Sequence, residues 1–186
     1  PGPFTFHMQE NYSYGAVVLD DFPDFHERVG SKRFSPHQVE IHPPPKGEKL
    51  CWLECKHCFT QTEIDEPGRI SGDRLVQIIK EISDGNTLTG EKPERLIFSG
   101  FRTDPLNSDT ILGVLEAAKD GGFLFGVYTK GIRVSDELIE VLTTENTARD
   151  YISFSIDAGN NPTYNSVHGV RNVQATLYDR VRDNIG

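Results

Sequence analysis

A fourfold alternation of short apolar segments and amphipathic segments constrains the fold of this chain more than any other feature. The predicted strands are residues 37–42, 95–100, 123–128 and 151–156. The predicted helices are residues 71–82, 108–118 and 135–142, followed by a fourth from about Val173. Apolar residues recur at helical spacing in the first of these helices, and Ser71 and Ser108 stand at expected N-cap positions. Strands that alternate with helices predict an α/β fold with a parallel sheet.

Size and charge limit what such a fold can do. With 186 residues, 36% of them hydrophobic, the chain is expected to bury one core and form one domain. No segment approaches the roughly 18 uninterrupted apolar residues of a membrane span, so a cytoplasmic protein without a membrane partner is expected. The formal net charge of -9 makes a nucleic-acid partner unlikely, because phosphate backbones are bound mostly by clustered Lys and Arg.

The three cysteines form the most specific motif. Cys51, Cys55 and Cys58 have the spacing CxxxCxxC, and their odd number and close clustering do not suit a secreted disulfide framework. Thiolates are soft ligands that suit an iron–sulfur cluster or zinc, so a metal site in a reducing compartment is expected. Three ligands leave one metal position open. Zinc would need a fourth donor, His57 or His42, and His57 lies between two of the cysteines, where shared tetrahedral coordination is strained.

The cysteine motif follows the first predicted strand and precedes the first predicted helix, and in this setting it resembles the signature of radical S-adenosylmethionine (radical SAM) enzymes. The resemblance implies a 4Fe-4S cluster whose open iron binds S-adenosylmethionine. One electron from the cluster then cleaves the cofactor to methionine and a 5'-deoxyadenosyl radical, which abstracts hydrogen from a substrate. It also implies a partial TIM-type barrel of six parallel β/α units, of which about four are present here.

The resemblance to this family divides the chain into two predicted parts. Residues 37–186 form the radical SAM core domain, incomplete at its C-terminus, and residues 1–36 form an N-terminal extension. Met8 is the only methionine, so residues 1–7 are consistent with a vector-derived leader.

The resemblance also assigns cofactor-binding roles to loop residues. His57, which precedes the third cysteine, and the adjacent Phe59 are expected to lie against the adenine. Ser99 and Gly100, together with Asp104 before Pro105-Leu106, correspond to the Gly-Gly-Glu type motif that holds the cofactor's amino group. For Asp104 the alternative is a carboxylate that caps a turn or helix.

Polar residues near the fourth strand complete the predicted site. Ser155 and Asp157 are expected to bind the cofactor's ribose and carboxylate, whereas Ser153 is interpreted as a small packing residue. Lys130 replaces the Asn of the family's Thr-Asn-Gly turn. Arg171 is expected to pair with the cofactor carboxylate or a substrate anion, or else to be a solvated surface residue.

The expected partners follow from the chemistry. The substrate is a small molecule, a peptide or a natural-product precursor, and no residue can be assigned to hydrogen abstraction itself. The cluster needs a reductant such as flavodoxin or ferredoxin, which are acidic, and Lys46, Lys49 and Lys56 surround the cysteine loop with positive charge. Two alternatives remain: a non-catalytic zinc-binding module that uses the three cysteines and a histidine, and a truncated relative that lacks a substrate pocket.

Overall fold

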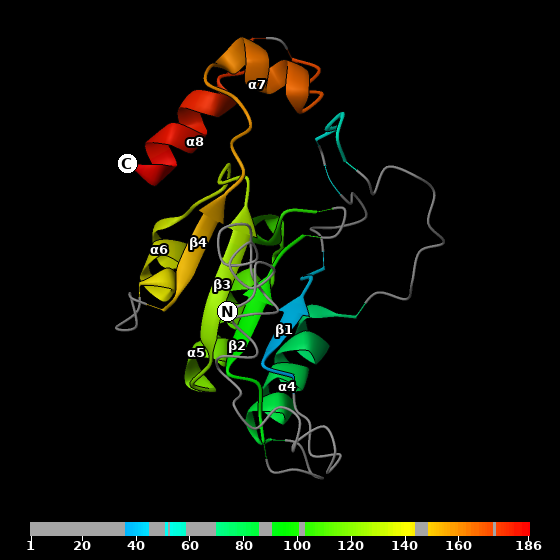
Figure 1. Ribbon diagram of the computed structural model, residues 1–186, viewed down its shortest axis with the longest axis vertical. Helices are drawn as coiled ribbons and strands as arrows, with labels where there is room; N and C mark the ends of the chain where they lie inside the picture. Colours follow the sequence, from blue (N-terminus) through cyan, green and yellow to red (C-terminus); the bar gives the residue numbers. More distant parts are fainter. Residues whose placement is uncertain are drawn as a thin grey trace, which may run out of the picture.

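The computed structural model of the protein describes residues 36–44, 51, 53–58, 70–85, 91–100, 103–143, 149–172 and 174–186 (Figure 1). Phe59, Lys46 and Lys49 lie outside the described residues, as does residue range 1–35 of the predicted N-terminal extension. None of the described helices combines the length and the apolar composition that crossing a bilayer requires.

The described strands form a single parallel sheet in the order β1-β2-β3-β4. The strands are β1 (Gln38–Ile41), β2 (Arg95–Phe98), β3 (Leu124–Thr129) and β4 (Tyr151–Phe154). Ile41 is paired with Phe98, Phe98 with Val127 and Val127 with Ile152, so the carboxyl ends of the strands meet along one edge. The predicted α/β fold of parallel β/α units is confirmed, and its strand order is that of a partial barrel.

Three helices pack against one face of the sheet: α4 (Gly72–Ser83), α5 (Ile111–Asp120) and α6 (Asp136–Leu142). A serine caps the free N–H groups at the start of α4 and of α6, whereas α5 begins without a side-chain cap and packs through its apolar residues. Ser71 caps α4 by accepting a hydrogen bond from the Arg74 N–H at 3.3 Å, as predicted. Ser135 caps α6 in the same way, accepting from the Leu138 N–H at 3.2 Å.

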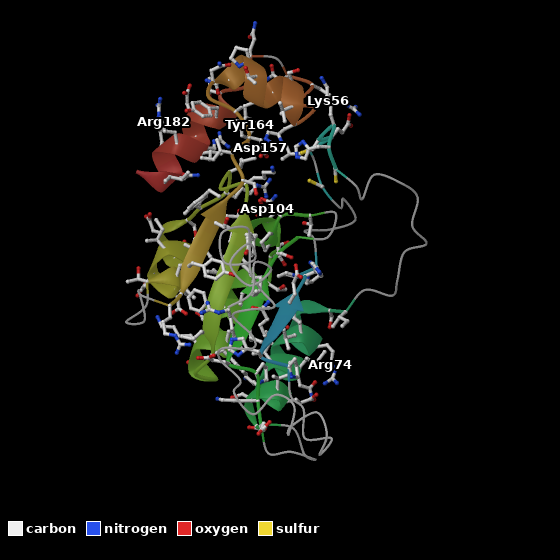
Figure 2. All side chains as sticks on the ribbon, viewed as in Figure 1. Lys56, Arg74, Asp104, Asp157, Tyr164 and Arg182 are labelled. Atoms are coloured by element: carbon white, nitrogen blue, oxygen red, sulfur yellow. The ribbon has the colours of Figure 1, made fainter. Side chains whose placement is uncertain are left out.

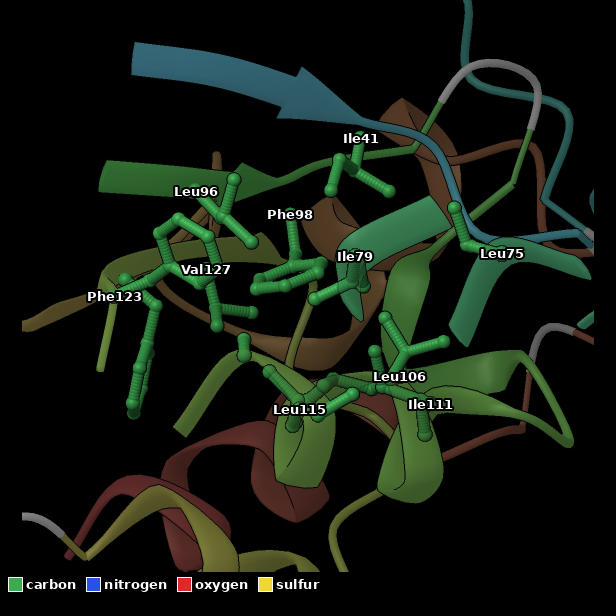
Figure 3. Packing of buried hydrophobic residues seen from close by; sticks show 14 of the residues in the cluster. Ile41, Leu75, Ile79, Leu96, Phe98, Leu106, Ile111, Leu115, Phe123 and Val127 are labelled. Carbon is green, nitrogen blue, oxygen red and sulfur yellow. The ribbon is translucent and has the colours of Figure 1, made fainter. Parts of the chain in front are cut away.

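The main core lies between these helices and the sheet (Figure 3). Leu96, Phe98 and Val127 come from the strands, and Ile79 and Leu115 come from the helices; all five are fully shielded from solvent. Because side chains alternate along a strand, the neighbours of the core positions point to the opposite face. Examples are Glu40 beside Ile41 and Tyr128 beside Val127.

Two further helices, α7 (Asn161–Val167) and α8 (Leu177–Ile185), lie together beyond the carboxyl end of β4 (Figure 1). They build a second hydrophobic cluster with the cysteine loop. Its buried members are Leu53, Cys55, Ile132, Tyr164, Leu177 and Val181. This second cluster fixes the cysteine loop against the end of the sheet.

Some predicted boundaries were wrong. The helix predicted from Ser108 begins at Ile111, because the short 3₁₀-helix η2 (Pro105–Asn107) precedes it and Ser108 lies in the extended connection. The helix predicted from about Val173 begins at Leu177, and α7 was not predicted. The fourth strand ends at Phe154, so Ser155 lies just past the strand.

Candidate cluster and cofactor site

A cavity of about 800 Å³ lies at the carboxyl ends of the strands. Its lining combines the cysteine loop with the segments that follow β2, β3 and β4. The lining residues that the sequence singled out are Cys51, Cys55, Lys56, His57, Cys58, Ser99, Gly100, Asp104, Lys130 and Ser155. Residues predicted separately from four segments of the chain are therefore brought together at one site, whereas the predicted Asp157 is not part of the cavity lining.

The cysteine loop is held by its own backbone and by the end of α7. The Cys58 N–H donates to the Cys55 carbonyl at 3.0 Å, which forms a tight turn. The Glu54 N–H donates to the His168 carbonyl at 3.0 Å, and the Lys56 N–H donates to the Val167 carbonyl at 3.1 Å. The three cysteines form no disulfide, and burial raises the pKa of the Cys55 thiol. The loop thus presents thiols that a metal would have to deprotonate on binding.

His168 is a site residue to which the sequence assigned no role. Its Nδ1 lies 3.0 Å from the Cys55 Sγ, and the residue is completely buried. Donor atoms of Cys55, His57 and His168 all lie within 4.8 Å of one another. Burial lowers the pKa of His168. Local spacing does not single out His168, because its contact with a residue 113 positions away depends on α7.

Asp104 is buried and receives three hydrogen bonds. The Leu106 N–H donates to it at 3.0 Å, so that Asp104 caps η2; the Thr129 hydroxyl donates at 2.8 Å, and the Lys130 N–H donates at 2.6 Å. Burial raises the pKa of Asp104, and these three donors partly offset the rise. The carboxylate therefore has the capping role that the sequence offered as an alternative, and it also ties β3 to the loop after β2. Its predicted contact with a cofactor amino group stays a prediction.

Lys130 supplies positive charge to the cavity. Its ammonium group donates to Asp157 at 2.6 Å, and its side chain is 18% exposed. This hydrogen bond holds the pKa of Asp157 below its usual value. Asp157 has a left-handed backbone conformation, with φ of 54°, just past the end of β4. Its carboxylate lies 3.9 Å from the His57 Nε2 and 3.8 Å from the His168 Nε2, so Asp157 connects the β4 loop to both histidines.

The segment after β2 forms another wall of the cavity. Ser99 donates to Glu40 at 2.5 Å and lies 3.1 Å from the His42 Nδ1. Gly100 is required by space, since a Cβ there would lie 1.6 Å from the Thr103 carbonyl oxygen. On the far side, the Ser155 N–H donates to the Thr129 carbonyl at 2.9 Å and extends the sheet pairing past β4.

Two basic residues near the cysteine loop have partners on the protein. Arg171 forms an ion pair with Glu54 while remaining largely exposed, and Lys56 donates to the Ser166 hydroxyl at 3.3 Å. Figure 2 shows Lys56, Asp157 and Tyr164 gathered beyond the end of the sheet, with Asp104 below them. Arg171 therefore joins the α7 segment to the cysteine loop.

Comparison with known proteins identifies the family. The model of the radical SAM superfamily matches residues 49–185. The chain belongs to the radical SAM superfamily. Enzymes of this superfamily use a 4Fe-4S cluster and S-adenosylmethionine, and membership does not favour the zinc-module alternative.

A curated relative in Pyrococcus furiosus is named tungsten-containing aldehyde ferredoxin oxidoreductase cofactor-modifying protein. The two are 26% identical over 107 residues, which are 58% of this chain and 28% of the relative. The chain therefore spans less than a third of the length of this relative.

Solved structures of SuiB from Streptococcus suis share the fold. The structure bound to S-adenosylmethionine gives a TM-score of 0.56 at 16% identity, and covers 97% of this chain and 41% of SuiB. The structure bound to the precursor peptide SuiA gives a TM-score of 0.54 at 14% identity, and covers 97% of this chain and 44% of SuiB. The parallel sheet and helices of this chain thus align with less than half of SuiB.

The residues present fit the cluster and the cofactor. Three soft thiol donors line one cavity, which suits a cluster that keeps one iron free for an outside ligand. The buried Tyr164 hydroxyl, on α7 and in the same buried cluster as Cys55, has no hydrogen-bond partner among the described residues. Buried polar groups are normally paired, so this hydroxyl is consistent with a polar group bound nearby.

Proposed function

We propose that this chain is the cluster- and cofactor-binding part of a radical SAM enzyme that abstracts hydrogen from a peptide or small-molecule substrate. The supporting observation is that all three cysteines line the same cavity as the polar residues at the carboxyl ends of β2, β3 and β4. When bound, the 4Fe-4S cluster supplies the electron that cleaves S-adenosylmethionine to methionine and a 5'-deoxyadenosyl radical.

Different residues of this chain bind the cluster and the separate groups of the cofactor. Cys51, Cys55 and Cys58 hold the cluster. Ser99, Gly100 and Asp104 hold the cofactor's amino group, Ser155 donates to its carboxylate, and Asp157 accepts from its ribose hydroxyls. His57, with the adjacent Phe59, lies against the adenine. These positions would fix the cofactor and keep water from the reacting bond, which is the protein's usual contribution to cofactor chemistry.

The substrate and the reductant are proposed from the structural comparison and from the charge of the cysteine loop. SuiB, which shares the fold, was solved with a precursor peptide, and this favours a peptide over a small molecule. The reductant is an acidic flavodoxin or ferredoxin, with Lys56 as part of its docking surface, because Lys56 is exposed beside the cysteine loop. We also propose a cytoplasmic location, where thiols stay reduced.

The decisive experiment measures 5'-deoxyadenosine. The protein is reconstituted anaerobically with iron and sulfide, reduced with dithionite and supplied with S-adenosylmethionine. We expect 5'-deoxyadenosine from the wild type and none from Cys51→Ala or Cys58→Ala. Ser83→Ala is a suitable control, because Ser83 bonds the Gly121 carbonyl at the opposite end of the sheet. A colourless protein that carries one zinc and cleaves no cofactor would overturn the proposal.

A further inference from the structure

The buried hydroxyl of Tyr164, on α7, has no role in the proposed binding of the cofactor. The residue is completely shielded from solvent, and its hydroxyl has no hydrogen-bond partner among the described residues. Burying an unpaired hydroxyl costs free energy, and such groups are normally paired in folded proteins. A phenylalanine would fill the same space without this cost, so the tyrosine points to an acceptor for its hydroxyl.

The ring of Tyr164 is fixed by α7, which limits where the hydroxyl can point. The Tyr164 N–H donates to the Asn160 carbonyl at 2.9 Å, and the His168 N–H donates to the Tyr164 carbonyl at 2.9 Å. The rings of Tyr164 and His168 pack with 4.2 Å between their centroids. The start of α7 is joined to α8, because the Asn161 side chain accepts from the Tyr178 N–H at 3.0 Å.

The charged groups near this hydroxyl belong to the cluster and cofactor site (Figure 2). Burial raises the pKa of Tyr164 above its ordinary value, and the negative charges of Cys55, Asp104 and Asp157 raise it further. These three groups are therefore near enough to act on the hydroxyl electrostatically. The phenol keeps its proton at neutral pH and is available as a hydrogen-bond donor.

The position of Tyr164 favours the cluster over the cofactor as the acceptor. Tyr164 is not among the residues that line the cavity, where the cofactor would bind, whereas Cys55 belongs both to the lining and to the smaller hydrophobic cluster with Tyr164. A group bonded to Cys55 is thus within the same buried cluster as the hydroxyl. Thiolate and sulfide sulfurs of an iron–sulfur cluster accept hydrogen bonds, which help to set its reduction potential.

We propose that the Tyr164 hydroxyl donates a hydrogen bond to a sulfur atom of the assembled 4Fe-4S cluster, at the corner that Cys55 holds. This inference rests on the proposed function, because it requires that Cys55 binds the cluster. The donated bond withdraws electron density from the sulfur, so it stabilises the reduced cluster and raises the reduction potential. A neutral phenol supplies the proton, so the bond depends on no change of ionisation in the site.

Two substitutions of tyrosine by phenylalanine test this role. Tyr164→Phe removes the hydroxyl and keeps the ring. Tyr178→Phe is the matched control, because Tyr178 packs at the partly exposed edge of the same hydrophobic cluster. Both variants and the wild type are reconstituted anaerobically with iron and sulfide, and their iron contents are measured.

Three measurements follow on the reconstituted proteins. An EPR-monitored redox titration gives the potential of each cluster. Resonance Raman spectra of the iron–sulfur stretches, recorded in light and in heavy water, report hydrogen bonds to the cluster sulfurs. Equilibrium binding of S-adenosylmethionine shows whether the hydroxyl instead contacts the cofactor.

We expect Tyr164→Phe to keep its iron, to shift to a lower potential and to lose part of the heavy-water shift, while Tyr178→Phe matches the wild type. Equal potentials and heavy-water shifts in all three proteins would overturn the proposal, as when an ordered water pairs with the hydroxyl. An unchanged potential with weaker binding of S-adenosylmethionine would overturn it too, because the cofactor would then be the acceptor. A wild type that assembles no 4Fe-4S cluster would instead overturn the proposed function, and this inference with it.

Discussion

At the scale of single residues, Asp104 shows how one side chain can join separate parts of the site. Its carboxylate accepts hydrogen bonds from η2 and from the end of β3, and only 8% of the residue is exposed. Removing a buried acceptor leaves its donors unsatisfied, at a typical cost of about 1–3 kcal/mol. Asp104 therefore has a structural role whether or not it also contacts the cofactor.

The buried carboxyl predicts a specific pH dependence. Because burial raises the pKa of Asp104 above its ordinary 3.8, the folded protein binds this proton more tightly than the unfolded chain does. The stabilisation is complete below that ordinary value and is lost as pH rises through the raised pKa. Relative to Asp104→Asn, which does not titrate, the wild type should lose free energy of unfolding as pH rises from about 4.

Urea unfolding of both proteins in the same cluster state, at a series of pH values, measures this difference. The Asn variant serves as the reference, because effects of other groups cancel in the comparison. A wild type that gains stability over the variant with rising pH would show that the three donors outweigh burial.

At the scale of elements, α7 connects the end of β4 to the cysteine loop. At Gly169, just after α7, the backbone lies close to the Glu54 backbone of that loop. Gly169 has φ of 60°, and an added Cβ would meet the Glu54 backbone at 2.2 Å. Gly169→Ala should therefore cost at least about 2 kcal/mol of folding free energy, from a disfavoured backbone and a clash.

Gly159→Ala provides the matched control, because nothing lies within 4 Å of a Cβ at that position. This variant should stay within about 0.5 kcal/mol of the wild type in urea unfolding. Equal stability of the two variants would show that α7 is not clamped to the cysteine loop at Gly169.

The sequence predicted the sheet better than it predicted α7. Strands β1 to β4 were found because their apolar residues are consecutive or alternate with polar ones within a short local stretch. In contrast, α7 holds Thr163, Val167 and several Asn and Ser residues, which favour helices only weakly. Its start signals were present: Asn160 accepts from the Thr163 N–H at 3.0 Å, and Pro162 occupies the first turn.

The same distinction explains the site. Cys51, Cys55 and Cys58 were recognisable from their local spacing, and the strand-end residues from the resemblance to the family; most of them line one cavity. The partnership of Lys130 with Asp157, and that of His168 with Cys55, depends on segments far apart in the sequence. Such pairs are set by the packing of loops, for which one sequence carries no local signal.

At the scale of the whole molecule, the described residues contain two separate hydrophobic clusters. The larger lies between the sheet and α4, α5 and α6, and it includes no residue of the cysteine loop. The smaller joins that loop to α7 and α8 through Cys55, Tyr164 and Val181. A metal held by the three cysteines would therefore stabilise the smaller cluster directly and the larger one only through the sheet.

Removal of iron should then destabilise the smaller cluster around the cysteine loop and leave the larger cluster at the sheet unchanged. After anaerobic chelation, hydrogen exchange should speed up in residues 53–58 and 164–170, whose backbone hydrogen bonds connect the loop to α7. Exchange in residues 75–82, 96–98 and 111–118 should stay slow, because the main core packs there. Cys51→Ser without chelation should give the same pattern. Uniform acceleration across both clusters would contradict the division, since it would mean that the metal stabilises the whole domain as one cooperative unit.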